Sequence, residues 1–414
     1  MNIKNILSKF GPGIITGASD DDPSGIATYS QAGAMFGLAT LWTAIVAFPL
    51  MAIIQQMCAR IGFVTGHGLA GTLKIHYPKW VLYFTILFSA PAIIMNIGAN
   101  ISGMGAVGNM LFPTIDSLYF SVVFTVFLLI LVIYFPYQKI SNVLKYLCIA
   151  MLVYCFVPFF YNHLSLTDIL YASVVPQFVM SKDFFAVIVG ILGTTISPYL
   201  FFWQASVEVE ERQHNKNLVV NKKSVQEIEN DVDSGMLFSG MIMYFIILTT
   251  GSVLFQNGIH TINTVDDAAM ALKPLLGNQA SLLFSIGIIA TGLIAIPVLS
   301  GSLSYMLSET IGMPFGLDNH FKEAKGFYTI IALSLVVGLS LNYVGITPID
   351  ALIYTAIFYG VTAPVLIAVI MHIANNKEIM GEFVNTRAMN IVGAITFMIM
   401  SISALALLYF SVFP

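Results

Sequence analysis

The sequence predicts an all-α integral membrane protein whose helices cross the bilayer eleven times. Its 414 residues are 57% hydrophobic and only 9% charged, whereas soluble chains carry about 25% charged residues. Apolar stretches of about 20 residues, the length of a membrane span, recur along the chain with short polar connections. The positive charges are distributed over these connections in the asymmetric manner of a membrane topology.

The eleven expected spans follow one another within a single transmembrane domain, residues 1–414. The first covers residues 12–36 with an interruption at 20–25, and the others cover 39–62, 80–108, 117–135, 140–161, 184–206, 234–257, 281–308, 327–346, 350–374 and 388–412. Spans one, three, six and eight contain Gly, Pro, Asn and Thr where a lipid-facing helix would contain Leu. We therefore expect these four spans inside the bundle.

The orientation follows from the positions of Lys and Arg. With the N-terminus in the cytoplasm, fifteen of the 17 basic residues fall inside, and only Lys182 and Lys273 fall outside. The inside set is Lys4, Lys9, Arg60, Lys74, Lys79, Lys139, Lys145, Arg212, Lys216, Lys222, Lys223, Lys322, Lys325, Lys377 and Arg387. Adding or removing one span destroys this asymmetry. We expect a protein of the cell membrane with a cytoplasmic N-terminus and an external C-terminus.

The first span contains three consecutive carboxylates, Asp20, Asp21 and Asp22, followed by the helix-breaking Pro23-Ser24-Gly25. Acidic side chains at membrane depth are costly and usually face a cavity or an ion path. Proline and glycine beside them free backbone carbonyls, which transporters use in cation sites. A structural kink alone is the alternative, but it does not require carboxylates. We expect a cation site at Asp22, with Asp20 and Asp21 lining the path.

A second interruption, Gly190 to Tyr199, lies in the sixth span and contains Pro198. Taken alone, it is as well explained by a packing kink. Breaks at corresponding places in two halves are, however, typical of inverted-repeat transporters, in which the substrate binds between them. The expected repeats are 12–161 and 184–374, and the span 388–412 is an additional helix.

These residues also carry a resemblance. Three segments in or beside the first span are similar to the Nramp family of divalent metal transporters. They are Asp22-Pro23-Ser24-Gly25, the run from Ile26 to Ala34 that contains Gln31-Ala32-Gly33, and the opening Gly11-Pro12-Gly13. That family usually reads D-P-G-N and then Q-A-G-A in the first span, and A-T-(I/V)-M-P-H in the sixth, where this chain has Thr194 to Tyr199. The resemblance extends over the whole chain and implies a LeuT-like fold with spans one and six broken at mid-membrane.

The chain departs from the family pattern at several positions. The usual Asn is Gly25, the usual Met is Ser197, the usual His is Tyr199, and a usual Asp and Glu of the third span are Ile97 and Asn100. A thioether favours transition metals over hard cations, so its replacement leaves oxygen ligands. The two smaller residues make the site roomier, which suits Mg²⁺ because it retains several waters. The pattern resembles the magnesium branch related to this family.

The expected metal site consists of Asp22, Gly25, Thr194 and Ser197. Asp22 binds the cation or its waters, Gly25 and Ser197 make room, and the Thr194 carbonyl is a further ligand or water acceptor. Residues expected around it or along the pathway are Asp20, Asp21, Ser24, Asn96, Asn100, Tyr199 and Glu208. Asn96 and Asn100 share one face of a helix and could bond waters of the ion or a neighbouring helix. Glu208 either attracts cations at the inner mouth or begins an ordinary solvated loop, 207–233.

The function expected from the resemblance and its departures is Mg²⁺ transport into the cytoplasm by alternating access. Mn²⁺ is tolerated, and no proton is coupled, because Tyr199, Ile97 and Asn100 carry no proton near pH 7. The alternatives are a proton-coupled Mn²⁺/Fe²⁺ transporter of the usual Nramp type and, less favoured, a Na⁺-coupled solute symporter. We expect no enzyme activity and no cofactor. The divalent cation and the lipid bilayer are the expected partners, without nucleic acid or an obligate protein partner.

Overall fold

The computed structural model describes residues 12–135, 154–157, 165–214, 219–317 and 319–412, which are helical almost throughout. The α-helices are α2 (Pro12–Asp20), α3 (Pro23–Phe36), α4 (Trp42–Thr65), α5 (Leu69–His76), α6 (Lys79–Leu111), α7 (Ser117–Tyr134), α10 (Leu166–Val174), α11 (Lys182–Thr195), α12 (Pro198–His214), α13 (Lys222–Val253), α14 (Val265–Ala269), α15 (Lys273–Leu276), α16 (Ala280–Ile311), α17 (Lys325–Ser340), α18 (Pro348–Asn375), α19 (Lys377–Met380) and α20 (Arg387–Val412). Short 3-10 turns are η2 (Phe255–Asn257), η3 (Met270–Leu272), η4 (Gly277–Gln279), η5 (Leu341–Val344) and η6 (Gly381–Phe383).

Nine stretches of the described residues are long and apolar enough to cross a membrane. They correspond to the expected spans two to four and six to eleven. The first expected span consists of α2 and α3, of 9 and 14 residues, which are separated by the break. The fifth, 140–161, lies outside the described residues except for Tyr154–Val157. The helical membrane fold is confirmed, and the full count of eleven stays a prediction.

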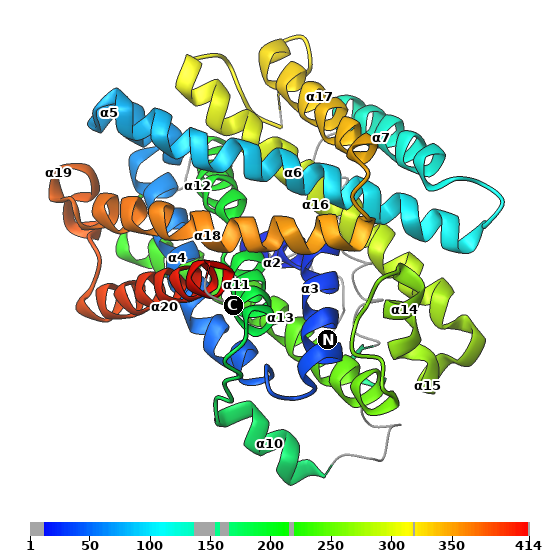
Figure 1. The fold of residues 1–414 in the computed structure, drawn as a ribbon. Coiled ribbons are helices and arrows are strands. Elements are labelled where there is room, and N and C mark those ends of the chain that lie inside the picture. The colour runs from blue at the N-terminus through cyan, green and yellow to red at the C-terminus, as the bar shows by residue number, and fades with distance from the viewer. Residues whose placement is uncertain (1–11, 136–153, 158–164, 215–218, 318, 413–414) are drawn as a thin grey trace, which may run out of the picture.

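The two halves of the first span lie in the middle of the bundle, where α18 passes across them (Figure 1). The helix α13 packs along both α2 and α3, α12 and α16 contact α2, and α11 packs against α3 and α18. In an apolar 18-residue window of each span, the buried share is 89% within Lys182–Gln213, the sixth span, but 22% within Ser117–Tyr134, the fourth. The sixth span is therefore interior, as its Gly, Pro and Thr content predicts.

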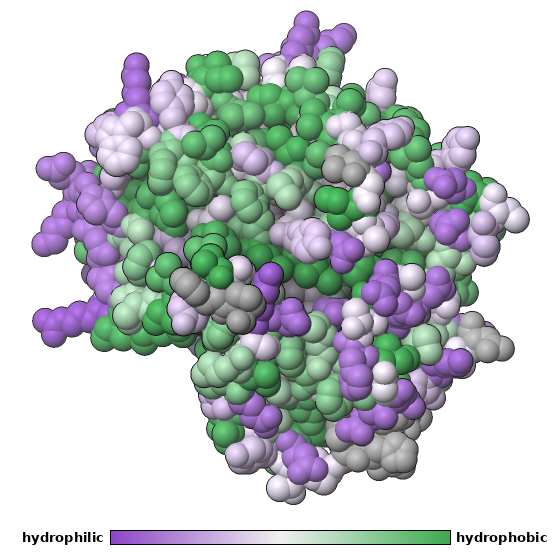
Figure 2. Space-filling view, viewed as in Figure 1, coloured by the Kyte–Doolittle hydropathy of each residue, from purple (hydrophilic) through white to green (hydrophobic). Residues whose placement is uncertain are grey.

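The surface of the bundle is largely apolar between two polar regions. In Figure 2, hydrophilic side chains gather at the left edge, over α19, and at the lower right, over α14 and α15, with green apolar surface between them. The topology predicted from the basic residues places α19 inside and the segment with α14 and α15 outside. The apolar surface between them is what contact with lipid tails requires.

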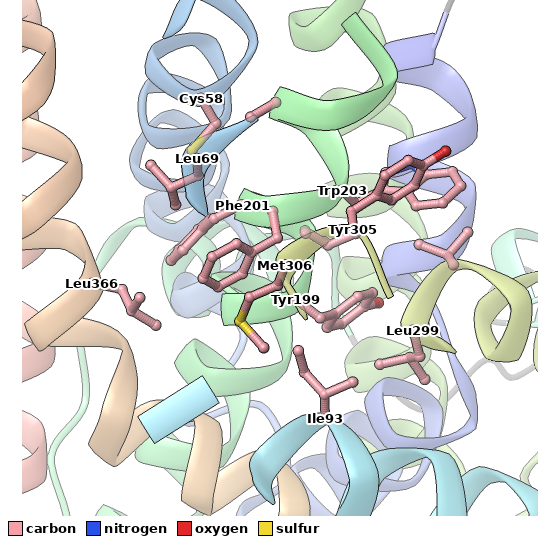
Figure 3. Close-up of a cluster of buried hydrophobic side chains, with 14 of the residues drawn as sticks. Cys58, Leu69, Ile93, Tyr199, Phe201, Trp203, Leu299, Tyr305, Met306 and Leu366 are labelled. Carbon is pink, nitrogen blue, oxygen red and sulfur yellow. The ribbon is translucent and has the colours of Figure 1, made fainter. Parts of the chain in front are cut away.

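Below the second break, α12 carries aromatic side chains into the largest hydrophobic core. Tyr199, Phe201 and Trp203 meet Leu299, Tyr305 and Met306 of α16, Ile93 of α6 and Leu366 of α18 (Figure 3). Trp203 is fully buried, with its ring 6.1 Å from that of Tyr305. This packing identifies Trp203 as a core residue and holds the first turns of α12 in place.

The prediction of a solvated loop at 207–233 is wrong for residues 207–214 and 222–233, which are helical. The helix α12 continues to His214, and α13 begins at Lys222, well before the apolar stretch. Asn221 caps α13 by accepting a hydrogen bond from the backbone N–H of Ser224, a role for which asparagine is favoured. Hydropathy locates only the apolar part of a helix. Both helices continue beyond that part through charged residues, which hydropathy alone does not distinguish from a loop.

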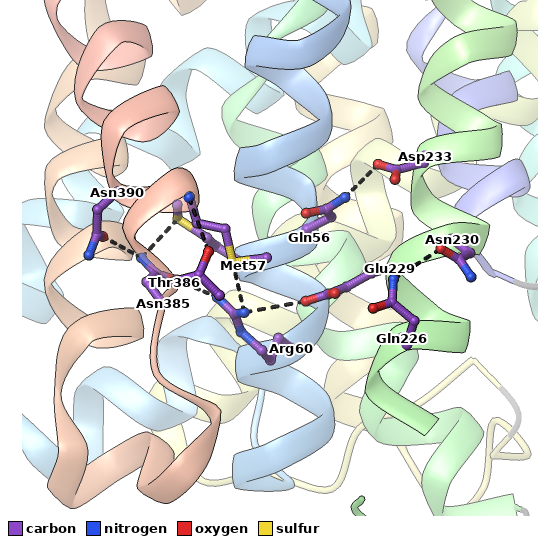
Figure 4. A network of polar contacts seen from close by, with 11 residues as sticks. Gln56, Met57, Arg60, Gln226, Glu229, Asn230, Asp233, Asn385, Thr386 and Asn390 are labelled. Carbon is purple, nitrogen blue, oxygen red and sulfur yellow. Dashed lines mark hydrogen bonds and ion pairs between the residues drawn. The ribbon is translucent and has the colours of Figure 1, made fainter. Parts of the chain in front are cut away.

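These charged extensions form a polar network on the side predicted to face the cytoplasm (Figure 4). Arg60 of α4 is buried and pairs with Glu229 of α13 at 3.3 Å. The same guanidinium donates to the Asn385 side chain ahead of α20 and to the Met389 sulfur. The network therefore joins three helices that are distant in sequence.

Replacing Arg60 by alanine should lower the free energy of unfolding by about 3–5 kcal/mol, because it leaves the Glu229 carboxylate partly buried without its partner. Thermal unfolding in detergent measures this loss. The matched control is Lys223→Ala, whose ion pair with Glu227 has side chains 86% and 64% exposed and should contribute little. Equal stability of the Arg60 variant and the wild type would show that the Arg60–Glu229 pair does not stabilise the fold.

Candidate functional site

The first helix break falls where the sequence predicts it. The helix α2 ends at Asp20, α3 begins at Pro23, and Asp22 is the N-cap of α3. The Asp22 Oδ1 atom accepts a hydrogen bond from the Gly25 backbone N–H at 2.8 Å. Proline suits the first turn because it has no N–H to leave unpaired, and aspartate is among the best N-caps. The local sequence thus places the Asp22 carboxylate at the positive end of α3.

The second break lies in the sixth span, also as predicted. The helix α11 ends at Thr195 and α12 begins at Pro198. Between them, Ile196 leaves the helical conformation with φ −110° and ψ 59°. Because proline disfavours a helical conformation in the residue before it, the sequence itself explains why the helix is interrupted at Ser197.

The two breaks are neighbours in space. A Cβ atom added to Gly25, in the first turn of α3, would lie 3.3 Å from the Thr194 Oγ1 atom at the end of α11. On the other side of the breaks, the Tyr199 hydroxyl of α12 donates to the Ser19 carbonyl of α2 at 2.8 Å. Segments as much as 180 residues apart in the chain therefore form one polar centre within the bundle.

Two amides of α6 hold the Asp22 carboxylate. The Nδ2 atoms of Asn96 and Asn100 each donate to the Asp22 Oδ2 atom at 2.9 Å. All three side chains are buried. The asparagines thus bond the first break, which agrees with the second of the two roles considered from the sequence, a hydrogen bond to a neighbouring helix. The Asn100 Oδ1 atom is buried and makes no hydrogen bond, so an acceptor beside Asp22 is left for a ligand.

Asp20 and Asp21 face α13 instead. The Ser239 hydroxyl lies 2.7 Å from the Asp20 Oδ2 atom and 3.2 Å from the Asp21 Oδ1 atom. The other oxygen of each carboxylate is buried without a hydrogen-bond partner, and neither group takes part in an ion pair between described residues. The sequence pattern did not reveal Ser239, because a lone serine in an apolar helix carries no signal of its tertiary neighbours.

Two details of the predicted site need correction. The Thr194 carbonyl, expected to be free, accepts a hydrogen bond from the Ser197 hydroxyl, although a carbonyl oxygen keeps a second lone pair. The room expected beside Gly25 is filled, because the Tyr29 ring and the Thr194 hydroxyl both lie 3.3 Å from where a Cβ would be. Neighbouring side chains pack into the space that a small residue leaves, so residue size alone does not predict an open site.

Glu208 and Ser24 are both buried. Glu208 lies within α12 and accepts a hydrogen bond from the Gln204 Nε2 atom at 2.8 Å, and the Gln204 Oε1 atom accepts one from the Thr16 hydroxyl of α2 at 2.5 Å. It is therefore not the start of a solvated loop. Ser24 donates to the Leu352 carbonyl of α18 at 2.8 Å. Ser24 therefore joins α3 to α18, whereas Glu208 is linked to α2 only through Gln204.

The groups at this centre are oxygen donors. In the described part of the chain, no three His, Cys, Asp or Glu side chains are grouped as a metal site. Asp22 instead stands among amide, hydroxyl and carbonyl oxygens, which suit hard cations such as Mg²⁺ and Mn²⁺. A single carboxylate with neutral oxygens around it is an arrangement that leaves part of a cation's shell to water.

Comparisons with known proteins agree with this architecture. The family model described as natural resistance-associated macrophage protein-like, Nramp, matches residues 13–410. The divalent metal cation transporter MntH of Caldanaerobacter subterraneus subsp. tengcongensis is 25% identical over 95% of this chain and 91% of its own length. The MntH protein of Klebsiella pneumoniae subsp. pneumoniae is 25% identical over 92% and 89%.

Solved structures show the same fold. The Eremococcus coleocola manganese transporter superposes with a TM-score of 0.75 at 17% identity, covering 97% of this chain and 86% of that one. Mhp1, a nucleobase-cation-symport-1 family transporter, superposes with a TM-score of 0.59 at 15% identity, covering 97% and 89%. At these identities the likeness concerns the fold, which is the LeuT-like fold that the resemblance to the Nramp family implies.

Proposed function

This chain belongs to the Nramp family, and from that premise we propose that it transports divalent metal cations across the membrane through the centre where its two helix breaks meet. The observation that carries the proposal is the Asp22 carboxylate, which is buried and held by two amides and one backbone N–H but by no cation of the described chain. Such a charge at membrane depth requires a partner. A transported divalent cation supplies it.

The family model covers residues 13–410, and nine stretches of the described residues are long and apolar enough to cross a membrane. We propose that the repeats 12–161 and 184–374 move relative to each other in alternating access, with 388–412 as an additional helix. The excess of basic residues on one side supports a cytoplasmic N-terminus and an external C-terminus in the cell membrane. The cation then passes into the cytoplasm along α2 and α12, where Glu208 lies.

We further propose that Mg²⁺ is the preferred cation and that Mn²⁺ is also carried. The support is the donor set: Asp22, the Asn100 amide oxygen, the Thr194 carbonyl and the Ser197 hydroxyl offer oxygen, and Ser197 stands where the family usually has a thioether. Mg²⁺ releases its waters reluctantly and binds through one or two carboxylates. A site with a single well-held carboxylate suits an ion that keeps part of its hydration shell.

The alternative is a proton-coupled Mn²⁺/Fe²⁺ transporter. The observation that favours it is the set of relatives, since the similar curated proteins are named divalent metal cation transporters and the similar structure is a manganese transporter. Uptake of Mn²⁺ into proteoliposomes, in competition with Mg²⁺ and Ca²⁺, separates the two. Our proposal requires that Mg²⁺ inhibit Mn²⁺ uptake at comparable concentrations and Ca²⁺ only weakly. Mn²⁺ uptake indifferent to excess Mg²⁺ supports the alternative.

Transport should proceed without a coupled proton. Tyr199, Ile97 and Asn100 replace the family's usual His, Asp and Glu, and Asn100 donates to Asp22 at 2.9 Å. The membrane potential supplies about 2.3 kcal/mol per charge per 100 mV, hence about 4.6 kcal/mol for a divalent cation. At a fixed inside-negative potential, Mg²⁺ uptake should leave the internal pH unchanged. Acidification in fixed proportion to Mg²⁺ entry would refute the uncoupled mechanism and indicate that Asp20 or Asp21 carries the coupled proton.

A further inference from the structure

The helix α18 forms a third wall of the metal centre. Its Leu352 carbonyl accepts the Ser24 hydroxyl at 2.8 Å, and the Thr355 hydroxyl lies 3.4 Å from the Asn96 Oδ1 atom. Near Gly360, α18 approaches α11 so closely that a Cβ on Gly193 would overlap the α18 backbone. Thr355 and Ala356, whose carbonyl oxygen that Cβ would overlap, lie three and four residues after Leu352 and therefore share one face of the helix with it. That face contacts the first break, the amide pair of α6 and the helix that leads into the second break.

Tyr359 lies on this face, one helical turn after Thr355. Its side chain is only 1% exposed, and its ring packs 5.8 Å from the Tyr199 ring. The Tyr359 hydroxyl lies beside Asn96, one of the two amides that hold Asp22, and is buried without a hydrogen-bond partner. A buried tyrosine hydroxyl normally finds a partner, so this one points to a ligand.

A second buried acceptor without a partner supports the same conclusion. The Asn100 Oδ1 atom makes no hydrogen bond, although the Nδ2 atom of the same amide donates to Asp22 at 2.9 Å. Waters bound to a divalent cation are strong hydrogen-bond donors, because the cation polarises them. Two unpaired oxygens beside one carboxylate are what a partly hydrated cation at Asp22 would use.

We propose that Tyr359 is a specificity-determining residue of the cation site, whose hydroxyl oxygen accepts a hydrogen bond from a water that the cation retains. The proposal rests on the proposed function. It adds that α18 contacts the cation's bound water rather than the metal itself. An ion that keeps its waters, as Mg²⁺ does, gains more from this contact than one that loses them readily.

The test is Tyr359→Phe, which removes the hydroxyl and keeps the ring that packs on Tyr199. In proteoliposomes, KM for Mg²⁺ should rise about threefold to tenfold, the equivalent of one hydrogen bond. KM for Mn²⁺ should rise less, and the maximal rate should stay the same. Thermal stability should not fall, since the lost hydroxyl has no protein partner.

The matched control is Tyr154→Phe. The Tyr154 hydroxyl is likewise buried and without a partner, but its backbone carbonyl accepts a hydrogen bond from Thr249. Thr249 lies ten residues after Ser239, or about 15 Å along α13, away from the three aspartates. The control should leave both KM values unchanged.

An unchanged KM for Mg²⁺ in Tyr359→Phe, or an equal rise for Mg²⁺ and Mn²⁺, would overturn the assignment. Failure of the proposed function looks different, because then the wild-type protein itself would transport neither cation. Comparison of wild type, Tyr359→Phe and Tyr154→Phe in one assay keeps these results apart.

Discussion

Replacing Asp22 by alanine is expected to abolish cation uptake. The variant removes the carboxylate to which Asn96, Asn100 and the Gly25 N–H all donate, and with it the proposed anionic ligand of the cation. Loss of one member of a buried charge pair costs about 2–5 kcal/mol, so affinity for Mg²⁺ and Mn²⁺ should fall by about 30-fold or more. Uptake into proteoliposomes and equilibrium binding in detergent both measure the effect.

Asp22 also caps α3, so the loss of a helix cap must be separated from the loss of a ligand. Asp116 is the matched control, since it caps α7 by accepting a hydrogen bond from the Leu118 N–H at 2.8 Å and lies in an exposed turn. Asp116→Ala should cost about 1 kcal/mol of stability and leave uptake unchanged. Asp22→Asn, which retains a capping side chain, should be as inactive as Asp22→Ala. Normal uptake by either Asp22 variant would exclude this carboxylate as the cation ligand.

Replacing Ser197 by methionine together with Gly25 by asparagine should shift the preference toward Mn²⁺. A thioether prefers transition metals to Mg²⁺, so the ratio of Mn²⁺ to Mg²⁺ uptake should rise on the order of tenfold, or about 1.4 kcal/mol. Competition between the two cations in proteoliposomes measures this ratio. Because the Tyr29 ring and the Thr194 hydroxyl fill the space beside Gly25, the single variant Ser197→Met should be measured as well.

Ser197→Leu serves as the control for this change, since leucine and methionine are similar in volume and only methionine offers sulfur. It should reduce uptake of both cations without reversing their order. A ranking that the double variant leaves untouched would contradict the argument from ligand softness. If Ser197→Leu shifted the ratio of Mn²⁺ to Mg²⁺ uptake as much as Ser197→Met, the selectivity would depend on side-chain volume and not on sulfur.

The breaks could be predicted because their causes are local. Pro23 and Pro198 each begin the helix that follows a break, and a carboxylate such as Asp22 is conspicuous in an apolar stretch. The spans could be predicted because hydropathy is summed over about 20 residues. Both signals are properties of short segments and need no knowledge of tertiary contacts.

The parts of the site that were not predicted depend on tertiary contacts. Ser239 and Tyr359 are ordinary residues of apolar helices, and only the packing of α13 and α18 brings them to the centre. The start of α13 at Lys222 was missed because a charged helical turn has the hydropathy of a loop. The Thr194 carbonyl was expected to be free because the sequence does not reveal that the Ser197 hydroxyl turns back to it.

The position of the bound cation tests the central claim most directly. Crystals grown with Mn²⁺, with diffraction data collected near the manganese absorption edge, locate the metal by its anomalous scattering. We predict a peak beside the Asp22 carboxylate, between α3 and the break from α11 to α12, that is absent from Asp22→Ala. A peak only at Asp20, Asp21 and Ser239, or one that persists without the Asp22 carboxylate, would contradict the account.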